Sequence, residues 1–287
     1  MAMTVSPREL ITGALDLPSL PEVVMRAIEL VNDPEASAID IGRVLSEDSA
    51  LTARLLKIVN SPFYGFPSRI DTVSRAITVI GTLDLLDLIL ATSVVKMFSG
   101  VPNDLVSMDS FWKHSLYGGV VARLLAARSK QPNVEHFFVA GLLHDLGSLV
   151  IYRKLPELAR EALLRARYNG IVLQQAEQEL LGFDHAMVGA ELIRMWKLPN
   201  SLVEAVEFHH NPGQAPNYPL IAAVVHVADV IASAIRSGGG ASEAAPPLET
   251  AAWDRIGLPI LAIEALLLEA DQQFGDAQSM ILGSHAA

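Results

Sequence analysis

The chain has 287 residues, of which 51% are hydrophobic and 18% are charged, and it contains no cysteine. This balance excludes intrinsic disorder, which needs low hydrophobicity and high charge density, and the missing thiols exclude disulfides, cysteine nucleophiles, zinc fingers and iron–sulfur clusters. The net charge of −11 argues against a broad basic face, so we do not expect a nucleic-acid partner.

The first residues lack the features of a signal peptide, because Arg8 and Glu9 precede any long apolar run. The two most apolar stretches are interrupted by charge, one by Asp84 and Asp87 and the other by Asp229. Neither stretch has the ~20 consecutive apolar residues that a membrane span needs. We therefore expect a soluble, cytoplasmic protein without a membrane partner.

Apolar residues recur at helical intervals along almost the whole chain, whereas alternating β-branched runs between tight turns do not appear in the sequence. The predicted fold class is therefore all-α. In the first part of the chain, Pro62 ends one helical run and Gly81 breaks another. The helices predicted here cover residues 21–31, 37–45 and 49–59, followed by a loop over 60–70 and two helices within 71–98.

A second block of helices begins after a boundary between Pro102 and Asp109. Its predicted helices cover residues 110–129, 133–147, 155–169, 172–181, 184–196, 200–210 and 219–236. The Gly-Gly-Gly-Ala-Ser run over 238–242 is typical of a flexible loop. The segment 251–282 predicts one or two helices that dock on the main body through Ile260, Ile263, Leu266 and Leu267.

These boundaries divide the chain into three parts. We predict an N-terminal helical subdomain over residues 1–105, a helical core over residues 106–236, and a loop followed by C-terminal helices over residues 237–287.

The most informative polar pair is His144-Asp145, which lies inside the apolar helix predicted over 133–147. Adjacent helical residues are ~100° apart, so both side chains can face one concave site. Gly147 permits a helix end or a close approach of another backbone. Taken alone, the pair is more often a helix-terminal His-Asp that is hydrogen-bonded into the core.

Other polar residues stand in similarly apolar helices. Asp229 needs a partner most, because a buried carboxylate is costly and only His226 is available nearby in the sequence to neutralise it. His136 is predicted to be a surface residue. The remaining members of this group are His114, His185, His209 and His210. Each alone is more often structural, but together they form the imidazole and carboxylate set that zinc, iron, manganese and nickel prefer.

The order His, His-Asp, His, His-His, Asp resembles the metal-dependent HD phosphohydrolase superfamily, in which the HD-GYP cyclic-di-GMP phosphodiesterases are the nearest functional analogue. The N-terminal half carries a more specific pattern in residues 17–21 (LPSLP), 46–57 (SEDSALTARLLK) and 59–65 (VNSPFYG). This pattern is similar to the HDOD family, the HD-related output domain, over about residues 15–236. The resemblance implies a bacterial signal-transduction or regulatory protein with an N-terminal subdomain packed on an HD-type core.

The resemblance also implies a ligand set and a chemistry. One metal would be held by His114, His144, Asp145 and Asp229, and Asp145 would bridge to a second metal held by His185, His209 and His210. The implied cofactors are one or two divalent transition-metal ions, iron first, with manganese, zinc or nickel as alternatives. Asp145 would be the catalytic residue, because it would bridge the two metals. A water between two metals becomes a nucleophile near neutral pH and can attack a phosphodiester.

Three departures from the phosphodiesterase pattern leave a second interpretation open. The lysine that usually follows His-Asp-x-Gly is Ser148 here, the Gly-Tyr-Pro loop is absent from the sequence, and Ser110 replaces the glutamate of three-metal members. One hypothesis is a phosphohydrolase or phosphodiesterase that takes a phosphoester or nucleotide ligand. The alternative is a non-catalytic output module that binds a signalling-protein partner and uses its metals as structural braces.

The aromatic loop over 60–65 also has two interpretations. It is either an exposed docking loop or a loop folded over the core, with Phe63 and Tyr64 inserted as plugs. We favour the second interpretation.

Overall fold

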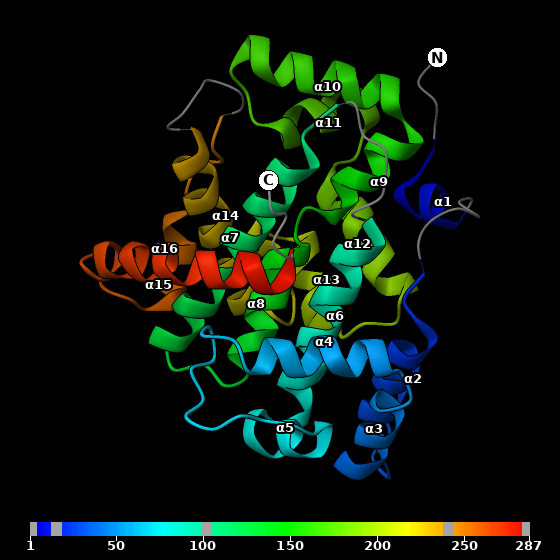
Figure 1. Ribbon diagram of the computed structural model, residues 1–287. Coiled ribbons are helices and arrows are strands. Elements are labelled where there is room, and N and C mark those ends of the chain that lie inside the picture. The colour runs from blue at the N-terminus through cyan, green and yellow to red at the C-terminus, as the bar shows by residue number, and fades with distance from the viewer. Residues whose placement is uncertain (1–4, 13–18, 99–104, 238–243, 283–287) are drawn as a thin grey trace.

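The structure, a computed structural model, describes residues 5–12, 19–98, 105–237 and 244–282, and every regular element in these ranges is helical (Figure 1). The predicted all-α class is therefore confirmed. The elements are α1 (Pro7–Thr12), α2 (Glu22–Val31), α3 (Ala38–Leu45), α4 (Ser49–Val59), α5 (Val73–Ile80), α6 (Thr82–Phe98), α7 (Met108–Arg128), α8 (Val134–Leu143), α9 (Leu146–Lys154), α10 (Pro156–Asn169), α11 (Leu173–Leu181), α12 (His185–Met195), α13 (Asn200–Glu207), η1 (Pro212–Gln214), α14 (Pro219–Ser237), α15 (Thr250–Ile256) and α16 (Ala262–Ile281).

Most predicted helices appear within a few residues of their expected bounds, but three predictions need correction. Helix α1, a short helix that packs against α12, was not predicted from the sequence. The helix expected over 133–147 ends at Leu143, and α9 begins at Leu146, so the predicted gap between 147 and 155 is helical. The helix expected over 200–210 ends at Glu207.

Some predictions fall in segments that the structure does not describe. The Gly238–Ser242 loop and Pro102 lie outside the described residues. The division at 105 and 236 stays a prediction. Core residues from α2, α7 and α16 belong to one continuous apolar cluster.

The loop over 60–70 is held against the core by Asn60 at the end of α4. Its side-chain amide donates to the carbonyl oxygens of Leu56 and Ile70 at 2.6 and 2.7 Å, and its oxygen accepts the Ile70 N–H. Phe63 is only 7% exposed and Tyr64 is partly buried, with the Arg123 guanidinium 4.5 Å above the Phe63 ring. These contacts support the folded-over interpretation of the aromatic loop.

Helices α7 and α8 approach closely at a glycine contact, and this contact sets the distance between the two helices. A Cβ on Gly141 would lie 2.8 Å from the Gly118 carbonyl oxygen, and a Cβ on Gly119 would lie 2.9 Å from the Phe138 carbonyl oxygen. Because no larger side chain fits there, the backbones pack directly on each other. This close packing brings the middle of α7 beside the end of α8.

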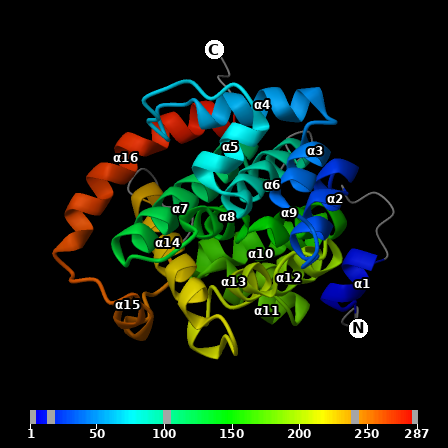
Figure 2. The same ribbon diagram turned by 90° about the horizontal axis from the view of Figure 1, so that it is seen from below.

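The C-terminal helix α16 lies across α7, and its last turns reach α4 (Figures 1 and 2). Tyr117 donates to Asp271 at 2.9 Å, and Arg128 pairs with Glu269 at 2.8 Å. Of the predicted apolar stripe, Leu266 is fully buried, whereas Ile260 precedes α16 and stays 63% exposed. The C-terminal segment therefore docks as predicted, but not through Ile260.

The stretch Val134–Lys154 meets the length and composition of a membrane-crossing helix, but 83% of its apolar window is buried inside the protein. Helices α5 and α6 reach the length and apolar composition of a membrane-crossing helix only when they are taken together, and the pair is bent by 114°. Val134–Lys154 therefore belongs to the protein core, and so does most of α6. Of these two, only the α6 stretch, which Asp84 and Asp87 interrupt, is among the apolar runs considered in the sequence.

Replacing Gly147 with alanine is expected to destabilise the fold by about 3 kcal/mol, the upper end of the usual cost of overpacking, because a Cβ there would lie 1.9 Å from the His185 carbonyl oxygen. Chemical denaturation of the two proteins measures the change in the free energy of unfolding. Gly275→Ala is the matched control: this glycine lies inside α16 with open space around it, and alanine there should stabilise by about 0.5–1 kcal/mol. Equal stability of Gly147→Ala and the wild type would contradict the close contact.

Candidate metal centre

His144 and Asp145 occupy the junction between α8 and α9 rather than the interior of one helix. His144 is completely buried, and its Nδ1 donates to the Gly141 carbonyl oxygen at 2.7 Å. Its Nε2 is thereby directed away from α8. Gly147, in the first turn of α9, lets that helix touch the backbone of α12 at His185. The local break thus turns both polar side chains toward the same space.

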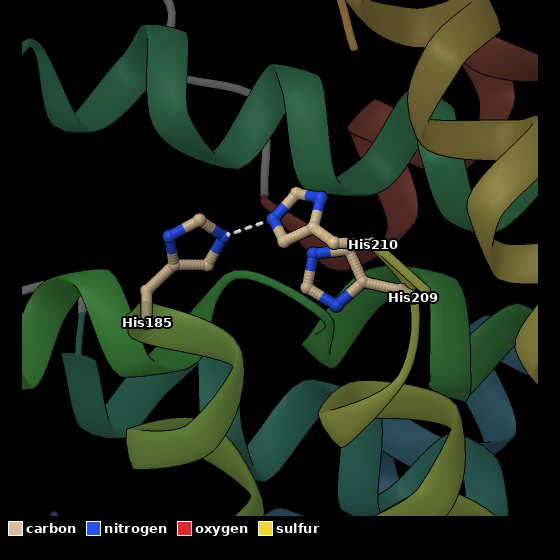
Figure 3. Close-up of side chains that lie close together, drawn as sticks. All are labelled: His185, His209 and His210. Atoms are coloured by element: carbon tan, nitrogen blue, oxygen red, sulfur yellow. Dashed lines mark hydrogen bonds between the residues drawn. The ribbon is translucent and has the colours of Figure 1, made fainter. Parts of the chain in front are cut away.

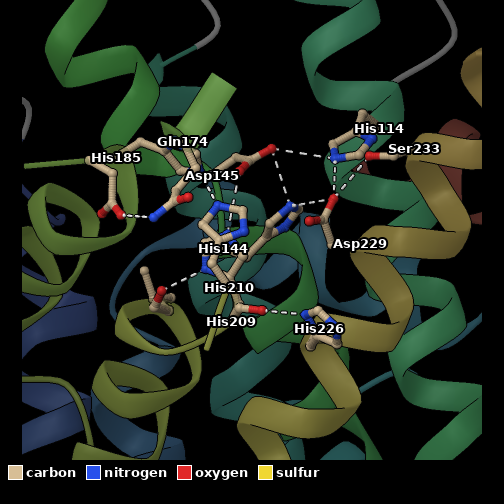
Figure 4. Close-up of polar contacts among 12 residues, drawn as sticks. His114, His144, Asp145, Gln174, His185, His209, His210, His226, Asp229 and Ser233 are labelled. Atoms are coloured by element: carbon tan, nitrogen blue, oxygen red, sulfur yellow. Dashed lines mark hydrogen bonds and ion pairs between the residues drawn. The ribbon is translucent and has the colours of Figure 1, made fainter. Parts of the chain in front are cut away.

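A first group of side chains gathers around Asp229, which lies on α14. Its Oδ1 is 3.3 Å from His114 Nε2 on α7 and 3.6 Å from His144 Nε2 (Figure 4). One ligand atom from each of the three residues lies within 4.8 Å of the others, which is close enough to share one cation. The carboxylate also accepts a hydrogen bond from Ser233 at 3.1 Å.

A second group is formed by three histidines from two segments, as Figure 3 shows. His185 opens α12, while His209 and His210 follow the end of α13. The Nε2 atoms of His185 and His210 are 2.9 Å apart, and the three residues again offer ligand atoms within 4.8 Å of one another.

Asp145 lies between the two groups and faces both. Its Oδ2 is 3.1 Å from His144 Nε2 and 3.4 Å from His114 Nε2. Its Oδ1 is 3.3 Å from His185 Nε2 and 4.0 Å from His209 Nε2. A carboxylate can bridge two cations through its two oxygens, so this placement joins the groups into one centre. All seven residues singled out from the sequence are brought together.

Hydrogen bonds from behind orient the histidine rings. Glu177 on α11 accepts from His185 Nδ1 at 2.6 Å, and the Val206 carbonyl oxygen accepts from His209 Nδ1 at 2.7 Å. Each bond fixes the ring so that Nε2 points into the centre, which is the arrangement found behind metal-binding histidines. Sequence reasoning missed Glu177, because a glutamate in a polar helix eight residues before a histidine carries no distinctive signal.

Two buried histidine nitrogens have no hydrogen-bond partner within the described residues: Nε2 of His144 and Nε2 of His209. His144 Nε2 lies 3.1 Å from Asp145 Oδ2, but the geometry is not that of a hydrogen bond. Buried polar atoms are rarely left unsatisfied, and a cation between the rings would satisfy both. The donor set of imidazoles and carboxylates therefore fits divalent transition metals.

Electrostatics divide the centre into charged and neutral members. Burial opposes the charge of Asp145 and Asp229, but the neighbouring His114 and His144 hold the pKa of both carboxyls well below its usual range. In the second group, burial and the nearby charge of His144 and His185 lower the pKa of His209 to about 4. A neutral imidazole is the form that binds a metal.

The histidines beside carboxylates behave in the opposite way. Burial lowers the pKa of His144, but Asp145 outweighs burial and raises it well above its usual value. Similarly, Glu177 raises the pKa of His185 to about 10 against the effect of burial. A cation that took these rings as ligands would have to displace their protons.

Two other histidines lie elsewhere than the sequence analysis expected. His226 does not neutralise Asp229: its Nδ1 donates to the His209 carbonyl oxygen at 2.7 Å, and its Nε2 accepts the Glu249 N–H at 3.0 Å. His226 therefore holds the turn that carries His209. His136 is not a surface residue but is partly buried, with partners on both ring nitrogens.

The centre opens into a cavity of about 630 Å³. Ser110 and Ser148, the two residues that depart from the phosphodiesterase pattern, both line it. On the facing helix α10, Arg160 and Arg167 line the same cavity, and neither has an ion-pair partner in the part of the chain that the structure describes. The cavity thus has a histidine and carboxylate floor and a cationic wall.

The fold and the centre define an all-α protein with histidines and aspartates clustered where five helices meet. The HDOD domain family model matches residues 17–212, and the chain belongs to this family. The resemblance drawn from the sequence is therefore confirmed.

Solved structures share the fold over nearly the whole chain. A Geobacter sulfurreducens HDOD domain protein of unknown function is 26% identical, with a TM-score of 0.79 and coverage of 96% of this chain and 97% of that one. A Shewanella amazonensis protein provisionally assigned as a phosphohydrolase is also 26% identical, with a TM-score of 0.71 and the same coverages.

A sequence relative is longer than this chain. An uncharacterized protein of Treponema pallidum is 28% identical over 212 residues, which cover 73% of this chain and 41% of that protein. The chain therefore spans about two fifths of the length of this relative.

Replacing Glu177 with glutamine is expected to lower metal affinity by about 10–100-fold, because the orienting acceptor behind His185 is weakened. Titration of chelator-stripped protein with Mn²⁺ or Zn²⁺ measures the dissociation constant. Glu179→Gln is the matched control, since Glu179 lies on the same helix, is exposed and faces Arg165. Equal affinity of both variants would show that Glu177 does not act on the centre.

Proposed function

We propose that this protein is a metal-dependent phosphohydrolase whose centre holds two divalent transition-metal ions. The observation that carries the proposal is the position of Asp145, with one carboxylate oxygen toward His114 and His144 and the other toward His185 and His209. The Shewanella relative supports the same class of activity.

The residues of this chain have distinct tasks in such a reaction. His114, His144 and Asp229 would hold one ion, His185, His209 and His210 the other, and Asp145 both. When bound, ions in this setting neutralise phosphoryl charge and supply a water acidic enough to act as a nucleophile. Glu177 and the Val206 carbonyl keep the rings of the second group in place.

The cavity wall supports a phosphoester as the substrate class. Arg160 and Arg167 lie seven residues apart on α10, with Leu163 and Leu164 between them on the same face of the cavity. Guanidinium groups bind phosphate oxygens with paired hydrogen bonds. They would provide the cationic contact that the phosphodiesterases obtain from the lysine replaced here by Ser148.

The proposal is tested with Asp145→Asn, which keeps the size of the side chain but removes its charge. We expect metal content to fall from two ions per chain to one or fewer, and turnover to fall at least roughly 100-fold, since even loss of an outer partner of a metal ligand costs 10–100-fold. Elemental analysis and hydrolysis of bis(p-nitrophenyl) phosphate and a panel of cyclic nucleotides measure the two effects. Asp109→Asn, an exposed carboxylate on α7, should change neither.

The arginine wall is tested by the double change Arg160→Gln and Arg167→Gln. Loss of charge-assisted hydrogen bonds, worth about 1.5–3 kcal/mol each, should raise KM at least roughly 10-fold and leave metal content unchanged. The control is Arg165→Gln, because Arg165 pairs with Glu161 and Glu179 and does not line the cavity. An unchanged KM in the double variant would remove the arginines from substrate binding.

The second candidate function is an output module whose metals brace the helices. The serine at position 148 favours it, because a phosphate-binding lysine is missing there. Wild-type protein that carries two metals, remains folded and hydrolyses none of these phosphoesters would favour this module over the hydrolase.

A further inference from the structure

A second chemically organised cluster lies away from the metal centre, at the beginnings of α8 and α13. His136 Nδ1 lies 3.1 Å from Asp87 Oδ2, and His136 Nε2 lies 2.7 Å from Ser201 Oγ. Because a carboxylate only accepts, Nδ1–H donates to Asp87, which leaves Nε2 free to accept the serine hydroxyl proton. A serine, a histidine and an aspartate in this order form the arrangement that activates a serine nucleophile.

The chain supports each member of this cluster differently. Asp87, on α6, is 8% exposed, so its charge is held inside the protein beside the imidazole. His136 and Ser201 are partly buried and border a cavity. The three residues come from helices α6, α8 and α13, which pack on one another in the order α6, α8, α13.

The bordering cavity has a volume of about 560 Å³ and shares no lining residue with the cavity of the metal centre. Its walls are mainly apolar, with Ile28 and Leu86 among the contributing side chains. Asp87, His136 and Ser201 all line it. Such a space suits an apolar chain whose reactive end lies at the polar cluster.

The start of α13 adds hydrogen-bond donors beside the serine. Pro199 caps the helix without a side-chain hydrogen bond, and the first amides with an acceptor are those of Leu202 and Val203. The N–H groups of Asn200 and Ser201 have no acceptor within the described chain. Backbone N–H groups beside a nucleophile are the donors that stabilise the oxyanion of an acyl-transfer intermediate.

We propose that Asp87, His136 and Ser201 form an acyl-transfer site that hydrolyses carboxylic esters with an apolar acyl chain. Ser201 Oγ attacks the ester carbonyl carbon, its proton passes to His136 Nε2, and the carbonyl electron pair moves to the oxygen near the α13 amides. When the intermediate collapses, the bond to the alcohol oxygen breaks and His136 returns the proton to the leaving alcohol. Water then repeats the addition on acyl-Ser201, which releases the carboxylic acid and restores the hydroxyl.

The test treats the full chain with a fluorophosphonate that carries a long alkyl group, followed by intact-mass measurement and peptide mapping. We expect one adduct per chain, mapped directly to Ser201, and no adduct in Ser201→Ala. Asp87→Asn should slow labelling by roughly 100-fold or more, since loss of the aspartate charge removes the support of the imidazolium. Hydrolysis of p-nitrophenyl decanoate should exceed that of p-nitrophenyl acetate.

The control is Ser49→Ala, which removes an exposed serine from the first turn of α4 and should label like the wild type. Labelling should also persist in the presence of a metal chelator, so the outcome does not depend on the metal centre. An unlabelled wild type, or an adduct mapped to another residue, overturns the proposal. Because mapping is done on the wild type, the result does not depend on whether a variant folds.

Discussion

The burial of Asp145 and Asp229 is the constraint on which the middle of this structure depends. A buried carboxylate is tolerated only when positive charge lies close to it, and five imidazoles from four segments supply the neighbours here. The two aspartates keep their charge because His114 and His144 lie within 3.1–3.6 Å of them. The interiors of α7 and α14 must therefore meet the end of α8, the start of α12 and the segment after α13, and the glycine contacts at Gly141 and Gly147 make this meeting possible.

Bound cations would offset the cost of burying the two carboxylates more fully than the neighbouring histidines do. Asp145 raises the pKa of His144 against the effect of burial, whereas burial lowers the pKa of His209 to about 4, and Nε2 of both rings lacks a hydrogen-bond partner. A divalent ion can satisfy several such atoms at once and compensates more negative charge than one proton. Since ligands that bind only the folded state stabilise it, a centre of this composition couples metal uptake to the stability of the helices that form it.

The sequence was informative where a polar residue interrupts an apolar helix. His114, His144-Asp145, His209-His210 and Asp229 are visible for that reason, and so is the helical class. The break between α8 and α9 was not visible, because no proline separates the two apolar runs and the turn at 144–145 forms through tertiary contacts. Glu177 and the cavity arginines, Arg160 and Arg167, were not visible either. The role of a charged residue on a polar helix depends on which surface it faces, and the sequence does not show that.

The two clusters occupy the two ends of the same pair of helices. His136 lies near the start of α8 and His144 follows its end, while Ser201 lies near the start of α13 and His209 follows its end. The hydrogen bond between His136 and Ser201 therefore ties together two helices whose other ends carry the candidate metal ligands. In a close-packed interior a shift of one helix against the other changes both ends. Any effect of a ligand at one end on binding at the other must then be matched by an equal effect in the reverse direction, because such coupling is reciprocal.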